Sequence, residues 1–177
     1  MGCGIGTSSP PTTSTSSTTT SSEPVTTLPT TTTTVVPRCS TGVLNATATS
    51  SGIAAGSAYE TFSLKNAGPS VCVVSGFANL AFFGTSGAGG AGAGSPLTVT
   101  ISESGTATTT ALVPNATATF SMRYSDEPVG GGGCVTVASA EVSLPGNAES
   151  LAFPVSLTLC GASVVIGPLG KAGSSSP

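Results

Sequence analysis

The sequence predicts an all-β protein whose domain is an antiparallel β-sandwich of about seven to eight strands. Three observations predict this fold class. Apolar and polar residues alternate in short segments, turn-forming residues separate these segments, and no stretch has the spacing of an amphipathic helix. The chain has 177 residues, which is enough for one domain and a tail.

The alternation predicts where each strand lies. The core is expected to begin in residues 62–84, the most apolar stretch, which holds four of the six phenylalanines. Gly76 within this stretch predicts a β-bulge or a close backbone approach, and a reversal of apolar parity near Ala138 predicts a β-bulge. This order of short strands is typical of an immunoglobulin-like sandwich. Strands are expected over residues 43–49, 57–66, 71–83, 97–102, 116–124, 134–144, 151–159 and 164–166.

Composition divides the chain into three parts. Residues 1–37 are rich in Thr, Ser and Pro and contain one charged residue, Glu23. Such a tract buries too little apolar area to offset the entropy of ordering it. We expect a disordered stalk over residues 1–37, a β-sandwich over 38–170 and a disordered tail over 171–177. The stalk resembles the O-glycosylated stalks of secreted proteins.

The start of the chain resembles a lipid attachment site. In Gly2-Cys3 a small residue precedes a Cys, as at the end of a bacterial lipoprotein lipobox. We expect Cys3 to be acylated, with the signal sequence missing upstream of Met1. The alternative is an accidental Cys beside a start Met, in a chain that stays in the cytoplasm. Because no run of about 20 apolar residues occurs, we expect membrane contact through the lipid alone.

Four cysteines lie in the expected domain, and strand order ranks their three possible pairings. If strands run alternately up and down, Cys39 precedes one upward strand and Cys72 begins the next, so both lie at one end. Cys134 starts a downward strand and Cys160 ends an upward one, so both lie at the other end. We expect the disulfides Cys39–Cys72 and Cys134–Cys160, which imply an oxidising, extracytoplasmic compartment. A metal site is the less favoured alternative, because CxxC spacing and His are absent.

Charge and residue types argue against most enzymatic and nucleic-acid functions. The net charge is −3 and 6% of residues are charged. The cations are scattered, whereas a nucleic-acid interface needs them clustered; they are Arg38, Lys65, Arg123 and Lys171. With no His and no GxSxG motif, we expect no enzymatic activity, no cofactor and no metal.

Carboxylate side chains are the groups on which an alternative, enzymatic or metal-binding function would depend. A carboxylate-based hydrolase or carbohydrate-active enzyme needs two acids facing one cleft at about 5–9.5 Å. The acids available in the domain are Glu60, Glu103, Asp126, Glu127, Glu141 and Glu149. Asp126 and Glu127, with Glu141 or Glu149, would also suit Ca²⁺. A solvated acidic turn before the glycines at 130–133 is the favoured interpretation of this pair.

Several motifs follow one another in a recognisable order. They are Cys39, KNAG at 65–68 followed by CVVSGF at 72–77, LVPNATA at 112–118, Cys134 and Cys160-Gly161. Over residues 38–169 this pattern resembles the actinobacterial family known as domain of unknown function 4232. Ala78 stands where that family usually has Pro, and Asn115 where it has Gly. The resemblance implies a secreted or lipid-anchored envelope domain with an immunoglobulin-like sandwich, and it implies no catalytic or ligand-binding residues.

Together these features predict a non-enzymatic, extracytoplasmic cell-envelope domain. We expect a monomeric, lipid-anchored binding or interaction module whose partner is an envelope protein or glycan. Tyr59, Phe77 and Tyr124 are candidate contact residues, because aromatic residues dominate binding hot spots. Packing in the core or at a sheet edge is the favoured interpretation of these three side chains. A carboxylate hydrolase and a purely structural envelope component are the two other hypotheses.

Overall fold

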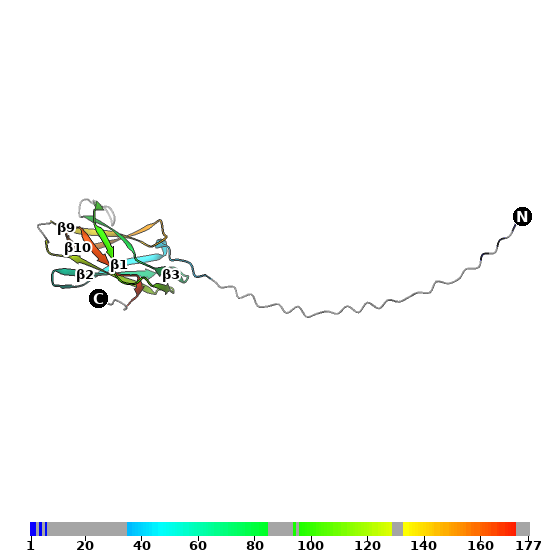
Figure 1. The fold of residues 1–177 in the computed structure, drawn as a ribbon, viewed down its shortest axis with the longest axis horizontal. Coiled ribbons are helices and arrows are strands. Elements are labelled where there is room, and N and C mark those ends of the chain that lie inside the picture. The colour runs from blue at the N-terminus through cyan, green and yellow to red at the C-terminus, as the bar shows by residue number, and fades with distance from the viewer. Residues whose placement is uncertain are drawn as a thin grey trace. The chain divides into compact units, whose positions relative to one another are not determined.

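The computed structural model shows an all-β domain (Figure 1). It describes residues 1–2, 4, 6, 35–84, 94, 96–128 and 133–172. Cys3, most of the predicted stalk and C-terminal tail, and residues 85–93 and 95 lie outside these residues. The described chain contains twelve strands and one 3₁₀ turn, Thr41–Val43. Within it, no helix is long and apolar enough to cross a membrane.

The first sheet has six strands, in the order β1-β2-β8-β11-β6, with β12 also paired to β8. Every second residue of β2 and β8 is buried, as their alternation predicts. The pairs are antiparallel except β11 with β6, which is parallel, so the expectation of a purely antiparallel fold is wrong here. Because β6 and β8 run in opposite directions, a strand between them must be parallel to one. The strands are Leu44–Ala54 (β1), Ser57–Asn66 (β2), Thr100–Glu103 (β6), Thr117–Ser125 (β8), Ser163–Ile166 (β11) and Gly170–Lys171 (β12).

The second sheet has four antiparallel strands in the order β10-β9-β4-β5. Phe83 of β4 pairs with Ser139, whereas the next residue, Gly84, pairs with Val137. This shift confirms the bulge predicted at Ala138, and it explains why Ser139 and Ala140 are both buried. The strands are Asn79–Gly84 (β4), Pro96–Leu97 (β5), Cys134–Ser143 (β9) and Ser150–Cys160 (β10).

The strand predicted over residues 71–83 is two strands in different sheets. Its first half, β3 (Cys72–Ser75), pairs with β7 (Thr109–Leu112), a strand that the sequence did not predict. Between β3 and β4, Gly76 has φ +82°, a conformation that other residues rarely adopt. Its N–H donates to the Thr108 carbonyl at 3.3 Å. Gly76 therefore marks a change of sheet and not a β-bulge, one of the two features predicted there.

The strand predicted over residues 97–102 is also two strands, one in each sheet. Its start is β5, in the second sheet, and its end is β6, in the first sheet. Alternation reports that one face of a segment is buried, and it does not report against which sheet. A segment that passes from one sheet to the other therefore keeps the alternation of a single strand.

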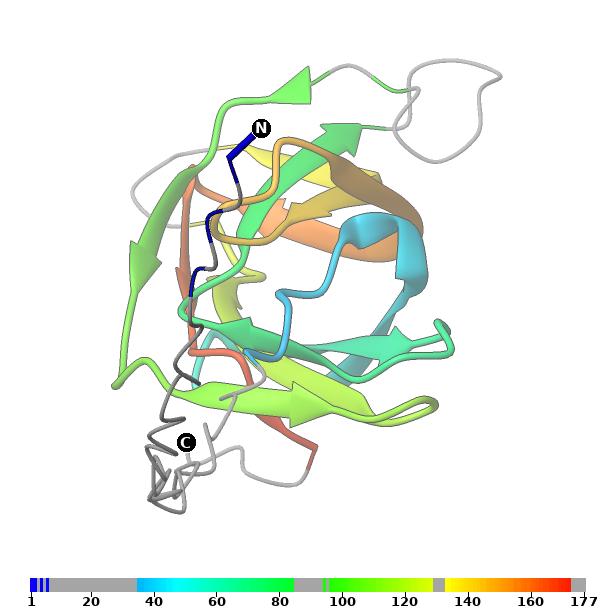
Figure 2. The ribbon, with the colours of Figure 1, turned by 90° about the vertical axis from the view of Figure 1, so that its right-hand side faces the viewer.

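One apolar core lies between the first and second sheets (Figure 2). The rings of Phe62 on β2 and Phe120 on β8 stack with centroids 4.9 Å apart. Phe62 also meets Phe153 of β10 edge-on at 5.8 Å, so the aromatic contacts join the two sheets. Such pairs contribute about 0.5–1.5 kcal/mol beyond their buried area. The phenylalanines therefore hold the inner faces together in a chain without Trp.

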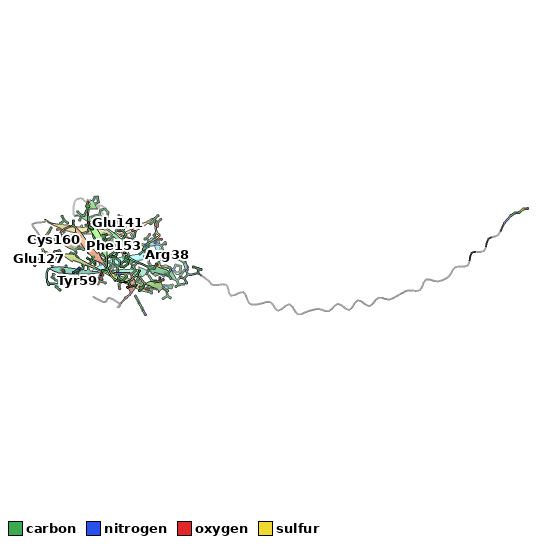
Figure 3. The ribbon with its side chains drawn as sticks, viewed as in Figure 1. Arg38, Tyr59, Glu127, Glu141, Phe153 and Cys160 are labelled. Atoms are coloured by element: carbon green, nitrogen blue, oxygen red, sulfur yellow. A yellow bond between two sulfur atoms is a disulfide. The ribbon has the colours of Figure 1, made fainter. Side chains whose placement is uncertain are left out.

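Two disulfides close the domain at opposite ends. Cys39, before β1, is bonded to Cys72 of β3, and Cys134 is bonded to Cys160 across β9 and β10. These are the pairs that strand order predicts. Figure 3 shows Arg38, next to the first disulfide, at one end of the domain and Cys160 toward the other. The two disulfides suggest an oxidising, extracytoplasmic environment.

A buried amide organises the end that contains Cys39. Asn66 is fully buried, and its Nδ2 donates to the carbonyls of Ser70 and Leu112, each at 2.9 Å. Its Oδ1 accepts the N–H of Gly68 at 2.9 Å. The Asn66 carbonyl accepts from the N–H of Asn115, whose φ is +68°. Asn tolerates this left-handed conformation better than most residues, so it serves where the family usually has Gly.

We predict that replacing Cys39 and Cys72 together by Ser lowers the free energy of unfolding by about 3.7 kcal/mol, because the unfolded chain loses a closed loop. Urea denaturation measures the change. The Cys134→Ser/Cys160→Ser variant is the matched control, with an expected loss of about 3.5 kcal/mol. Unchanged unfolding midpoints in both variants would contradict this account of stability.

We predict that Asn66→Ala costs about 3 kcal/mol, because it leaves the buried Leu112 carbonyl, and the part-buried Ser70 carbonyl and Gly68 N–H, without the Asn partner. The exposed Asn45→Ala on β1 is the control, with an expected change below about 0.5 kcal/mol. Thermal unfolding of the two variants tests the difference. Equal effects would show that the Asn66 amide does not organise this end.

Candidate functional site

The aromatic residues proposed as partner contacts have different environments. Tyr124 is 8% exposed and belongs to the core, because it lies on the inner face of β8 opposite Ala58. Phe77 is half-buried and packs against the core. These two therefore follow the favoured interpretation of core packing. Tyr59 points the other way from β2 and is half-buried on the outer side of the first sheet (Figure 3).

The six acids of the domain lie on several elements. Glu141 on β9 accepts a hydrogen bond from Ser150 Oγ at 2.7 Å, and Glu149 accepts one from Thr41 Oγ1 at 3.4 Å. Among the residues that the structure describes, no group of three or more His, Cys, Asp and Glu is arranged to hold a metal ion. The described residues therefore do not assemble the Ca²⁺ ligand set considered for Asp126 and Glu127 with Glu141 or Glu149.

The carboxyl groups of Glu60 and Asp126 act electrostatically on Tyr124. Glu60 is 6% exposed, because its position on β2 faces the core beside Met122, and burial raises the pKa of its carboxyl above the ordinary value. Burial also raises the pKa of Tyr124, and the negative charges of Glu60 and Asp126 raise it further. Oδ1 of Asp126 is buried without a hydrogen-bond partner. Ionisation of the buried Glu60 carboxyl therefore costs stability.

A pocket of about 230 Å³ opens beside the Cys39–Cys72 disulfide. Most of its exposed wall is apolar, and Arg38 is the one ionisable side chain in it. Arg38 Nη1 donates to the Pro145 carbonyl at 3.2 Å, which ties the guanidinium to a residue outside the pocket lining. Such a wall suits a small apolar group. The lining residues are Pro37, Arg38, Ser40, Val43, Gly68, Pro69, Ser70, Val71 and Cys72.

The first sheet presents a second candidate surface, its outer face. Strand register aligns its outward residues in rows across β1, β2, β8 and β11. Two rows consist of hydroxyl side chains, a third contains Asn45, Lys65 and Thr117, and the fourth places Tyr59 directly beside Arg123. We call this surface the outer face. It consists of Asn45, Thr47, Thr49, Tyr59, Thr61, Ser63, Lys65, Thr117, Thr119, Ser121, Arg123 and Val165.

Sequence reasoning did not identify the pocket or the outer face. The pocket depends on contact between residues 37–43 and 68–72, which only the folded chain brings together. The Thr and Ser residues of the outer face were visible as the polar half of each alternating strand. Their alignment depends on the pairing of β2 with β8, which lie far apart in the chain.

Comparison with known proteins gives one match. The model of the family described as "Domain of unknown function (DUF4232)" matches residues 39–170. No curated protein and no solved structure matches the chain. The matched range begins at Cys39 and ends at Gly170, so it contains both disulfides, the pocket's 68–72 segment and all of the outer face.

We predict that the domain loses stability as pH rises from about 4.5, since the unfolded chain releases the Glu60 proton there whereas the folded domain keeps it to higher pH. Glu60→Gln should raise the melting temperature at pH 7 and flatten this decline. The variant leaves Tyr124 and Asp126 unchanged. The control Glu141→Gln, on an exposed carboxyl, should leave the decline unchanged. If stability declined equally steeply with pH in Glu60→Gln, the decline would not come from the Glu60 carboxyl.

Proposed function

Since the chain belongs to the DUF4232 family over residues 39–170, we propose that it is a non-enzymatic, extracytoplasmic cell-envelope domain that acts as a lipid-anchored binding module. The proposal includes acylation at Cys3, a stalk over residues 1–37, an actinobacterial source and immunoglobulin-like connectivity of the sandwich. The Gly2-Cys3 motif, the composition of the stalk and the family resemblance support these parts.

The pair of disulfides carries the proposal. All four domain cysteines are paired, with Cys39, Cys72 and Cys160 at most 5% exposed. Structural disulfides form and persist outside the reducing cytoplasm. An anchored protein in that compartment needs an attachment point at one end of the chain and a surface for its partner. Cys3 offers the first, and the pocket and the outer face offer the second.

A binding role is favoured by the kind of surface that the domain presents. The pocket joins an apolar wall to one guanidinium, which suits recognition by shape and a single polar contact. The outer face presents hydroxyls, one phenol ring and two cations on a rigid sheet. Groups held on paired strands stay in fixed positions, so a partner binds with little ordering cost.

We predict that the protein purified from the membrane fraction of its native host carries a diacyl or triacyl mass on Cys3, with hexose increments on the stalk. Intact mass spectrometry of the full chain measures both. The matched Cys3→Ser variant should be made in the same host and should leave the membrane fraction for the soluble extracytoplasmic fraction. An unmodified Cys3 in a chain recovered from the cytoplasm would contradict the proposal.

A further inference from the structure

We propose that the outer face binds an anionic polysaccharide of the cell envelope. This inference rests on the proposed function, because it names the partner class of the binding module. It starts from the charges of the outer face. Lys65 and Arg123 are its only ionisable side chains besides the Tyr59 phenol, and both are exposed. No ion pair of either cation occurs among the described residues.

The charge of the outer face is opposite to that of the whole protein. The chain has a net charge of −3, yet every carboxylate of the described domain lies outside the outer face. The inner position of Glu60 on β2 illustrates this separation, since its neighbours Tyr59 and Thr61 point outward. An anionic partner is therefore attracted to this surface and repelled by the remainder of the domain.

The hydroxyl rows add chemistry that suits a sugar. Thr47, Ser63 and Thr119 form one row, and Thr49, Thr61 and Ser121 form the next. Each hydroxyl can both donate and accept a hydrogen bond. Neighbouring strands lie about 4.8 Å apart, so hydroxyls within a row are spaced on the scale of the hydroxyls of a pyranose ring, and successive rows lie about 6.6 Å apart. A polymer of sugars therefore meets matching groups along the sheet.

Tyr59 and Arg123 give the outer face an anchoring pair. They are directly opposite in the β2–β8 register, so their Cβ atoms lie about 4.5–5.5 Å apart. The phenol ring offers a flat apolar surface for the apolar side of a sugar. The guanidinium beside it forms paired hydrogen bonds to a carboxylate or phosphate. One acidic sugar residue would engage both side chains.

The spacing of the two cations favours a linear polymer. Lys65 lies opposite Thr117, six residues from Arg123 along β8, which corresponds to about 20 Å. An extended chain of several sugars spans this distance. An anionic membrane is less suitable, because lipid recognition uses clusters of four to eight basic residues. Nucleic acid likewise requires a denser basic patch.

The test uses the full chain with its disulfides intact and polygalacturonate as the probe. Isothermal titration calorimetry should show binding to polygalacturonate and none to neutral dextran, with affinity falling as salt rises. Arg123→Gln and Tyr59→Ala should each weaken binding at least about tenfold, and Lys65→Gln should weaken it less. Lys171→Gln is the control: it removes the same charge from β12, opposite the inward-facing Ala118, and should bind as the parent does.

Four outcomes would overturn the inference. Equal binding to dextran would show that charge plays no role. An equal loss of affinity in Lys171→Gln and Arg123→Gln would show that binding depends only on net charge. Binding to vesicles of anionic lipid in place of the polysaccharide would assign the outer face to the membrane. If polygalacturonate does not bind while Cys3 is acylated and the chain stays in the envelope, this inference fails and the proposed function stands.

Discussion

Covalent closure at the two ends of the sandwich is the constraint on which the rest of the structure depends. The core holds phenylalanines, one tyrosine and mostly aliphatic residues, and no Trp, so its burial gives less stabilisation than a core rich in large aromatics. Cys39–Cys72 fixes the segment before β1 to β3, beside the Asn66 amide network. Cys134–Cys160 fixes the ends of β9 and β10. These links hold the strand pairs whose register creates the pocket and the outer face.

Much of the fold could be predicted because local alternation and strand order report it. The run from Ala116 to Tyr124 predicts β8, and the parity change at Ala138 predicts a bulge that both neighbouring strands show. Strand order also gave the cysteine pairs. β7 was missed because Thr109–Leu112 is short and mostly polar. The change of sheet at Gly76 and the parallel pairing of β11 with β6 depend on contacts between distant segments, which local patterns do not contain.

The candidate sites were harder to predict than the strands for the same reason. Tyr124 could be assigned to the inner face of β8 from its parity, yet the effect of the Glu60 charge on its pKa depends on the pairing of β2 with β8. Tyr59 and Arg123 are 64 positions apart in sequence and become neighbours only through that pairing. The polar half of an alternating strand is ordinarily read as solvent-facing. Here the alignment of these polar side chains across four strands makes them a candidate binding surface.

The sandwich separates its polar groups by place. The charges of Glu60 and Asp126 act on the inward-facing Tyr124, while the cations Lys65 and Arg123 lie on the outer face. The apolar pocket lies at the end closed by Cys39–Cys72. This separation gives a small domain with few charges distinct surfaces for distinct partners, and the disulfides fix each surface in position.

Thiol labelling in intact cells of the native host tests the central claim most directly. Cells are treated with a membrane-permeant maleimide before lysis, and the chain is then analysed by intact mass with and without reduction. The account predicts that none of the four domain cysteines is labelled before reduction and that all four are labelled after it. Labelling of Cys39, Cys72, Cys134 and Cys160 without reduction would contradict it, because the domain would then fold in a reducing compartment without the covalent closure of its ends.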